Sequence, residues 1–413
     1  MPIQTARRTH GFRESVIRGM TRLAREYNSL NLAQGFPNFP APDALKEAAI
    51  RAVRDDINQY AITWGAQHLR EALARTYAAR YRLEADPERE ITVTCGATEA
   101  MIATLLAVVD PGGEVIVFEP FYENYGPDTI LADARPVFVP LEPGQPLDLD
   151  RLAAAFSPRT RAIVVNTPGN PSGRVLTRAE LEAIRDLCVR HDALAVTDEI
   201  YEHIRYEGEH IPIATLAGMR ERTVTISGAS KTFSVTGWRV GWIVAPAGLT
   251  DAIRKVHDFL TVGAPAPLQA GVAVALDSLG EDFYRGLAAD YRRRRDLLHS
   301  ALRSSGFGCT RPEGAYYILA DYSGLAPLAG NPADDTAFAV WLSREVGVTP
   351  VPGSSFFREG GAGRSLVRFV FCKTEEVLGE AARRLGTLAG GAAGRRGEGV
   401  EGTEAATRSG LQR

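Results

Sequence analysis

Seven short apolar runs between residues 91 and 245 constrain the fold of this chain most strongly. They are rich in β-branched residues, and they cover residues 91–95, 114–119, 136–140, 162–166, 193–198, 223–227 and 240–245. Nearly continuous apolar runs of this kind are typical of strands that are covered on both faces. Helical patterns lie between several of them, for instance at 98–109 and 178–191. This alternation predicts an α/β fold with a mostly parallel seven-stranded sheet.

The composition narrows the class of protein. The chain has 413 residues, with 47 Lys and Arg against 50 Asp and Glu, so its net charge is −3. We therefore expect no nucleic-acid partner, because no surplus of cations is available for phosphate backbones. No apolar run reaches the 18 residues of a membrane span, and the polar start lacks a secretory signal. The four cysteines form no CxxC pair, which disfavours a disulfide framework or a metal site and favours the cytoplasm.

The remaining sequence predicts how the chain divides into domains and terminal segments. We expect residues 42–285 to form the large domain, beginning with a helical stretch over 42–80, and residues 286–389 to form a smaller α+β domain. The small domain would contain strands at 315–322 and 365–372 and helices near 334–346 and 374–388. Residues 1–41 would pack on it, and the tail 390–413, almost without large apolar residues, should be disordered. A long helical region over 267–304 carries four consecutive arginines, which we interpret as a solvated face.

The first group of candidate catalytic and binding residues surrounds Lys231. Small residues surround it in SGASKTF (227–233), and Arg239 follows eight positions later. A lysine held near fixed cations can have a lowered pKa and can form a Schiff base with a carbonyl group. Ser230 and Arg239 are both suited to binding a phosphate.

Three other polar segments follow predicted strands. They are TCGATEA (94–100), NTPGNPSG (166–173) and DEIY (198–201). Open α/β sheets bind ligands at this end of their strands, and a Gly-Ala-Thr turn that opens a helix offers free N–H groups to a phosphate. Each segment alone could be only a turn or a helix start.

Taken together and in order, these segments resemble the class I/II aminotransferases, which have the aspartate aminotransferase fold (fold type I of the pyridoxal-phosphate-dependent transferases). The resemblance covers about residues 12–388. Residues 31–40, 57–60 and 118–122 look like the kynurenine, glutamine and methionine aminotransferase branch. The resemblance implies pyridoxal 5′-phosphate as cofactor, amino acid and 2-oxo acid substrates, and a homodimer with shared active sites.

The resemblance also implies residue roles. Lys231 would hold the cofactor covalently and move the substrate proton, and Asp198 would face the pyridine nitrogen. Tyr201 and Asn170 would bind the ring oxygen, and Tyr122 would stack on the ring. The phosphate would be held by Gly96, Ala97, Thr98, Ser230 and Arg239, and by Tyr60 of the neighbouring subunit. Arg368, between apolar neighbours in LVRFVF, would bind the substrate α-carboxylate together with Asn170 and Gly35.

Departures from the branch bear on the substrate. Ile17 stands where some members have a pocket Trp, and Gly263 stands where some have a His. Aspartate enzymes need a second cation for the side-chain carboxylate of their substrate. This chain lacks one at both expected positions, because Thr98 stands where one aspartate-specific branch has Lys, and no Arg lies near Gly263. We therefore expect a neutral or aromatic donor such as methionine, glutamine or kynurenine.

Other functions stay open at this point. They are an aspartate aminotransferase with a mobile Arg18 as the second cation, a cysteine-conjugate β-lyase, a specialised biosynthetic transaminase, and a non-catalytic regulator that keeps the fold. A Rossmann dehydrogenase is disfavoured, because no GxGxxG motif follows an early strand.

Overall fold

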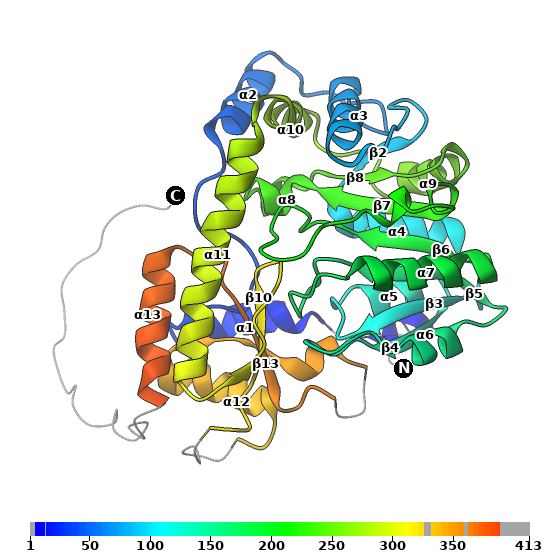
Figure 1. Cartoon of the computed structure of the whole chain (residues 1–413). Coiled ribbons are helices and arrows are strands. Elements are labelled where there is room, and N and C mark those ends of the chain that lie inside the picture. Colours follow the sequence, from blue (N-terminus) through cyan, green and yellow to red (C-terminus); the bar gives the residue numbers. More distant parts are fainter. Residues whose placement is uncertain (1–4, 13, 326–331, 359–361, 389–413) are drawn as a thin grey trace.

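The structure, a computed structural model, describes residues 5–12, 14–325, 332–358 and 362–388 and shows a large sheet part beside a smaller α+β part (Figure 1). The predicted tail 390–413 lies outside the described residues. The strands are β1 Leu30–Asn31, β2 Ile91–Thr94, β3 Glu114–Glu119, β4 Arg135–Pro140, β5 Thr160–Asn166, β6 Leu194–Asp198, β7 Thr223–Gly228, β8 Gly241–Val244, β9 Gly308–Cys309, β10 Tyr317–Asp321, β11 Val348–Thr349, β12 Val351–Pro352 and β13 Leu366–Val370.

The helices surround these strands and connect them. They are α1 Val16–Glu26, α2 Asp43–Arg54, α3 Gln67–Tyr81, α4 Gly96–Val108, α5 Tyr125–Leu131, α6 Leu149–Ala155, α7 Arg178–His191, α8 Ala229–Thr232, α9 Ala247–Leu260, α10 Ala266–Ser278, α11 Glu281–Ser304, α12 Asp335–Trp341 and α13 Glu375–Leu385.

All seven predicted strands meet in one sheet, in the order β2-β8-β7-β6-β5-β3-β4. Every neighbouring pair is parallel except those of β8, which is antiparallel to β2 and β7. The link from β7 to β8 contains only the four-residue α8 and a 3₁₀ turn. A parallel return would need a full crossover, so this short link makes β8 run back. The predicted mostly parallel sheet is confirmed.

Alternating side chains of each strand pack on opposite helical layers, because successive strand residues point to opposite faces. Ile116 and Phe118 of β3 pack with Ile184 of α7 on one face. Val115 and Val117 pack with residues of α4, α5 and α9 on the other face. Both faces are therefore covered, which explains why the strand sequences are almost entirely apolar.

The smaller part has its own antiparallel sheet, β12-β13-β10-β9. Helix α11 extends from the large part, near α2 and α10, into the smaller part, where it lies beside α13 (Figure 1). Met20 of α1 and Leu32 belong to the same apolar cluster as this sheet, and β1 pairs in parallel with β11. The domain division at 285/286 stays a prediction, and that point falls inside α11.

Two helix expectations were wrong. Residues 42–80 are not one helical stretch, because α2 ends at Arg54, α3 begins at Gln67, and the segment between them is a loop. Arg295 does not lie on a solvated face. It is 1% exposed, and its guanidinium binds Glu207 at 3.0 Å and Asp296 at 2.8 Å. It shares a helix face with the buried Tyr291 and Leu298, four residues before it and three after it.

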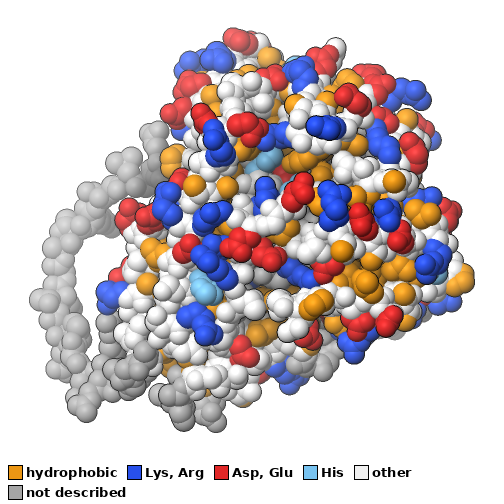
Figure 2. Space-filling model, viewed as in Figure 1, with side chains coloured by type: hydrophobic (Ala, Val, Ile, Leu, Met, Phe, Trp, Pro, Cys, Tyr) orange, Lys and Arg blue, Asp and Glu red, His pale blue; other side chains and the backbone are white. Residues whose placement is uncertain are grey.

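Charged side chains of both signs are interspersed over the face seen in Figure 2. No helix within the described ranges is long and apolar enough to cross a membrane.

Candidate active site

A cavity of about 540 Å³ lies where the carboxyl ends of β5, β6 and β7 meet α1, the start of α4, β10 and β13. Eleven of the predicted site residues line it, namely Gly35, Ala97, Thr98, Tyr122, Asn170, Asp198, Tyr201, Ser230, Lys231, Arg239 and Arg368. Gly96 directly precedes two of them. Tyr60 is 86% exposed and does not line the cavity of its own chain.

The start of α4 and Arg239 form one corner of the cavity. The first N–H groups of a helix have no partner within it, and the helix dipole makes this end positive. Gly96 has a φ of +80°, and a Cβ there would lie 2.4 Å from the Arg239 guanidinium. Among the described residues, Arg239 reaches only neutral acceptors, Thr236 O at 3.2 Å, Cys95 O at 3.4 Å and Thr98 Oγ1 at 3.5 Å. This corner therefore suits a polyvalent anion such as phosphate.

A buried carboxylate holds this corner in place from behind. Glu99 accepts hydrogen bonds from Cys95 N at 2.5 Å and Thr261 Oγ1 at 2.6 Å, and it pairs with His257 Nδ1 at 2.6 Å. The other ring nitrogen of His257 lies 2.7 Å from Thr63 O. These contacts tie the first turn of α4 to α9 and to the loop between α2 and α3.

Asp198 ends β6 and is buried. Tyr125 donates its hydroxyl to Asp198 Oδ2 at 2.7 Å, and Ile200 N lies 3.3 Å from Oδ1. Burial raises the pKa of Asp198, and these two hydrogen bonds oppose that rise. The carboxylate therefore has a fixed orientation and can pair with a cationic ring nitrogen.

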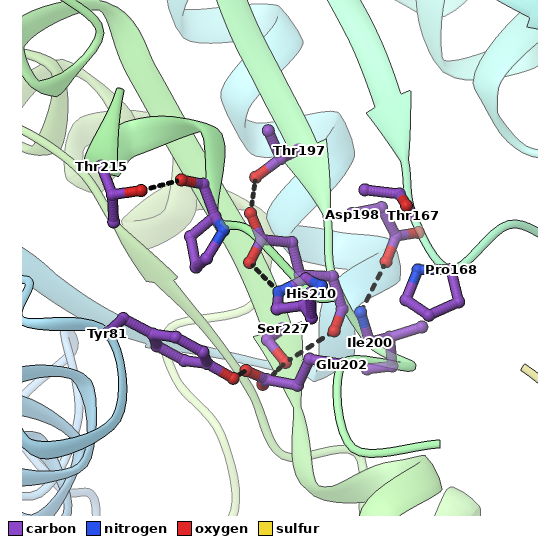
Figure 3. Close-up of polar contacts among 12 residues, drawn as sticks. Tyr81, Thr167, Pro168, Thr197, Asp198, Ile200, Glu202, His210, Thr215 and Ser227 are labelled. Carbon is purple, nitrogen blue, oxygen red and sulfur yellow. Dashed lines mark hydrogen bonds and ion pairs between the residues drawn. The ribbon is translucent and has the colours of Figure 1, made fainter. Parts of the chain in front are cut away.

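A polar network lies behind the turn that carries Asp198 and Tyr201 (Figure 3). Glu199 pairs with His210 at 2.8 Å and accepts a hydrogen bond from Thr197 at 2.8 Å. Glu202 accepts hydrogen bonds from Ser227 at 2.8 Å and from Tyr81. Because Glu199 and Glu202 are anchored in the interior, Asp198 and Tyr201 are left facing the cavity.

Lys231 lies on α8, with its Nζ 3.5 Å from the carbonyl oxygen of Gly35. Burial lowers the pKa of this amine to about 8, and the nearby Arg239 and Arg368 cations act in the same direction. A substantial fraction of the amine is therefore neutral near pH 8 and able to act as a nucleophile or base. Gly35 approaches closely, since a Cβ there would lie 2.7 Å from the Tyr317 hydroxyl.

Arg368 of β13 is 1% exposed and binds no carboxylate among the described residues. Its Nη1 donates to Asn170 Oδ1 at 2.9 Å and its Nη2 to Ala33 O at 2.7 Å, while Nε has no partner. A buried guanidinium without a countercharge is costly. The side chain faces the cavity lining, so a carboxylate ligand would complete its coordination.

Sequence reasoning missed several lining residues, among them Tyr125, Tyr317 and Asp128. Tyr125 binds Asp198, and Tyr317 shares a hydrogen bond of 2.6 Å with the hydroxyl of Tyr201. Asp128 is 5% exposed, its Oδ2 has no hydrogen-bond partner in the described part of the chain, and burial raises its pKa to about 7. No motif surrounds these three residues, so no local pattern pointed to them. Ile17 and Arg18 line the cavity, whereas Gly263 does not.

Comparison with known proteins gives the family. Residues 27–385 match the model of the family described as aminotransferase class I and II. The chain belongs to the class I and II aminotransferases. The non-catalytic alternative is therefore dropped, and the predicted enzyme class is confirmed.

Individual relatives cover nearly the whole of this aminotransferase. It is 40% identical to a probable N-succinyldiaminopimelate aminotransferase of Mycobacterium tuberculosis, over 93% of this chain and 98% of the relative. It is 38% identical to the methionine aminotransferase of Escherichia coli (89% and 94% covered) and 37% identical to human kynurenine–oxoglutarate transaminase 1 (90% and 95%). The solved N-succinyldiaminopimelate aminotransferase structure from M. tuberculosis superposes with a TM-score of 0.89 at 39% identity, covering 94% and 100% of the two chains. The predicted fold type and family branch are confirmed.

Members of this family use pyridoxal 5′-phosphate, and the cavity residues fit that group. The corner formed by α4 and Arg239 matches its phosphate, and the buried Asp198 matches its ring nitrogen. Lys231, with its lowered pKa, matches its aldehyde.

Proposed function

We propose that this aminotransferase moves the amino group of a neutral or aromatic amino acid, such as methionine, glutamine or kynurenine, to a 2-oxo acid in the cavity around Lys231. One observation carries the proposal: a nucleophilic amine, a buried carboxylate and a buried unpaired guanidinium line the same cavity. Amine, ring-nitrogen partner and carboxylate clamp are the three groups that amino-acid chemistry on this cofactor needs.

When bound, pyridoxal phosphate supplies a conjugated ring that accepts the electron pair left on the substrate α-carbon. Gly96, Ala97, Thr98, Ser230 and Arg239 would hold its phosphate, Tyr122 would stack on the ring, and Tyr201 with Asn170 would bind the ring oxygen. Asp198, held by Tyr125, would keep a proton on the ring nitrogen.

The protein side chains have separate roles toward the substrate. Arg368 binds the α-carboxylate as a two-pronged pair, and Asn170 and the backbone of Gly35 complete that grip. This fixes the α-carbon beside Lys231. The neutral amine of Lys231 would take the proton from the α-carbon and hold it for its return, and its pKa of about 8 leaves a fraction of the amine neutral near neutral pH.

The preference for neutral donors rests on the cavity lining. In the cavity, the cations Lys231, Arg239 and Arg368 are all engaged by these roles, and Ile17 offers an apolar surface. An acidic side chain held inside without a partner would lose several kcal/mol, roughly a thousandfold in specificity. The E. coli relative named for methionine supports a neutral donor.

We also propose a cytoplasmic homodimer with shared sites. Exposed apolar side chains gather on neighbouring segments, namely Ile50 and Val53 of α2, Ile57, Tyr60 and Ile62 of the following loop, and Phe259, Leu260 and Val262 at the end of α9. The contact of His257 with Thr63 joins the loop to α9. A patch of this kind is typical of a subunit interface. Tyr60 on it would reach the phosphate of the partner's cofactor.

The test compares amino donors. With 2-oxoglutarate held constant, kcat/KM for at least one of methionine, glutamine, leucine and phenylalanine should exceed that for aspartate. A clear preference for aspartate would overturn the substrate proposal. Borohydride treatment of the holoenzyme should attach the cofactor to Lys231, and a reduced adduct found by mass spectrometry on another residue would overturn its assigned role.

A further inference from the structure

The cavity wall carries one cation that the proposed function leaves unused. Four cationic side chains line it, Lys231, Arg239, Arg368 and Arg18. The first three have partners in the proposed chemistry, namely the cofactor aldehyde, its phosphate and the substrate α-carboxylate. Arg18 has no such partner, and it differs from Arg368 in being exposed.

Helix α1 sets the position of Arg18 at the cavity. Ser15 caps the helix by accepting a hydrogen bond from Arg18 N at 3.4 Å, and it donates its hydroxyl to Glu123 Oε1 at 2.6 Å. Glu123 directly follows Tyr122, so the first turn of α1 is tied to the loop beside the ring-stacking residue. Ile17 and Arg18 both line the cavity as a result.

The Arg18 guanidinium has no ion pair within the part of the chain that the structure describes. Glu14, the acid four residues before it, binds Arg22 at 2.9 Å instead. Glu123, which also lines the cavity, is not within ion-pair distance of Arg18, and its carboxylate accepts the Ser15 hydroxyl. The positive charge of Arg18 is therefore available to a ligand.

We propose, building on the proposed function, that Arg18 binds the distal carboxylate of a five-carbon dicarboxylic substrate such as glutamate or its 2-oxo acid. Ile17 contacts the side chains of neutral substrates in the same cavity. Because Arg18 is exposed while Lys231 and Arg368 lie deeper, it meets the outer end of a bound substrate. A five-carbon dicarboxylate extends further from the α-carbon than aspartate does, so it gains more.

The exposure of Arg18 sets the size of the effect. A hydrogen bond between charged groups contributes about a tenfold to hundredfold preference where solvent is excluded, whereas an exposed ion pair contributes up to about fivefold. A neutral substrate leaves Arg18 in water, so it carries no penalty. The same site therefore accepts neutral donors and dicarboxylic acceptors, with up to about fivefold discrimination from Arg18.

Glutamate and glutamine provide the test, because they are nearly isosteric and differ in charge. The ratio of kcat/KM for glutamate over glutamine is measured in the wild-type holoenzyme and in Arg18→Gln, Arg18→Lys and Arg25→Gln. Arg25 is the control, since it is exposed on the same helix and does not line the cavity. We expect the ratio to fall about threefold to fivefold in Arg18→Gln, to fall less in Arg18→Lys, and to match wild type in Arg25→Gln.

Binding gives a second readout that does not depend on turnover. Glutarate and valerate are five-carbon acids with two and one carboxylates, and the ratio of their inhibition constants should change in Arg18→Gln by the same factor. Equal ratios in Arg18→Gln and Arg25→Gln would overturn the role of Arg18 while leaving the transaminase intact. Absence of transamination in wild type with every donor would overturn the proposed function instead.

Discussion

Asp198 is the residue on which the electronic part of the proposed mechanism depends. Its carboxylate is oriented by Tyr125 and by Ile200 N, so replacing it by the isosteric amide changes the charge and little of the packing. In Asp198→Asn we expect a folded, cofactor-binding protein whose single-turnover rate with methionine falls about a thousandfold, equivalent to roughly 4 kcal/mol in the barrier. Asp186→Asn, on the exposed side of α7, is the control. A near-wild-type rate in Asp198→Asn would remove Asp198 from this role.

The buried carboxyl of Asp128 predicts how the free energy of unfolding depends on pH. Its Oδ2 is unpartnered within the described residues, and burial raises its pKa to about 7 from a usual value of 3.8. Between these two values the unfolded chain has released the proton and the folded protein still holds it. The free energy of unfolding therefore falls as pH rises from about 4 to about 7, by at most roughly 4 kcal/mol.

Asp128→Asn removes that titration. In the cofactor-free protein we expect the variant to be more stable than wild type at pH 8, by between about 1 and 4 kcal/mol, and to differ much less at pH 4.5. Urea unfolding at the two pH values measures this, with the exposed Asp150→Asn as control. A variant that is equally destabilised at both pH values would mean that the Asp128 carboxylate has a partner in solution.

At the scale of elements, the strands of the large sheet could be predicted and two features of the helices could not. The apolar runs identify strands because a sheet covered on both faces needs them, and all seven occur. The break between α2 and α3 and the burial of Arg295 depend on what packs against each helix, which a local pattern does not contain.

The site residues likewise fall into those that could be predicted from the sequence and those that could not. The polar segments after β2, β5, β6 and β7 could be predicted because strand ends of one sheet edge converge. Tyr317 could not, because it comes from β10 of the other sheet and reaches Tyr201 only through tertiary packing. Asp128 and Tyr125 stand on α5, whose sequence gives no sign that one of its faces lines a cavity.

The start of α4 yields a prediction at this scale. Glu99 holds Cys95 N, Thr261 and His257 at once, so Glu99→Gln removes a charge from three short contacts and leaves His257 without its carboxylate. We expect a loss of about 2 to 4 kcal/mol in the free energy of unfolding and faster release of the cofactor. Urea unfolding and cofactor dissociation measure the two effects. Glu47→Gln, exposed on α2, should change neither.

At the scale of the whole molecule, the cavity is built by both parts of the chain. The large sheet contributes Asp198 and the α4 corner, whereas α1 and the smaller part contribute Arg18, Tyr317 and Arg368. A relative movement of the two parts would therefore change the distance between the carboxylate clamp and the amine. The exposed patch around Tyr60 adds a third contributor in the proposed dimer, because Tyr60 does not line its own cavity.

Mixed dimers test this last point. Tyr60→Ala and Lys231→Ala should each be strongly impaired, the first by weak phosphate binding and the second by loss of the amine. In a mixed dimer with shared sites, one site combines Lys231 of one subunit with Tyr60 of the other and is native, while the second site lacks both. Random exchange makes about half of the dimers mixed, so activity should recover to about a quarter of wild type. If each site used its own Tyr60, no native site would form and mixing would restore nothing. Light scattering of the unmixed proteins checks that both variants remain dimers, which ensures that a failure to recover activity reflects the site and not the assembly.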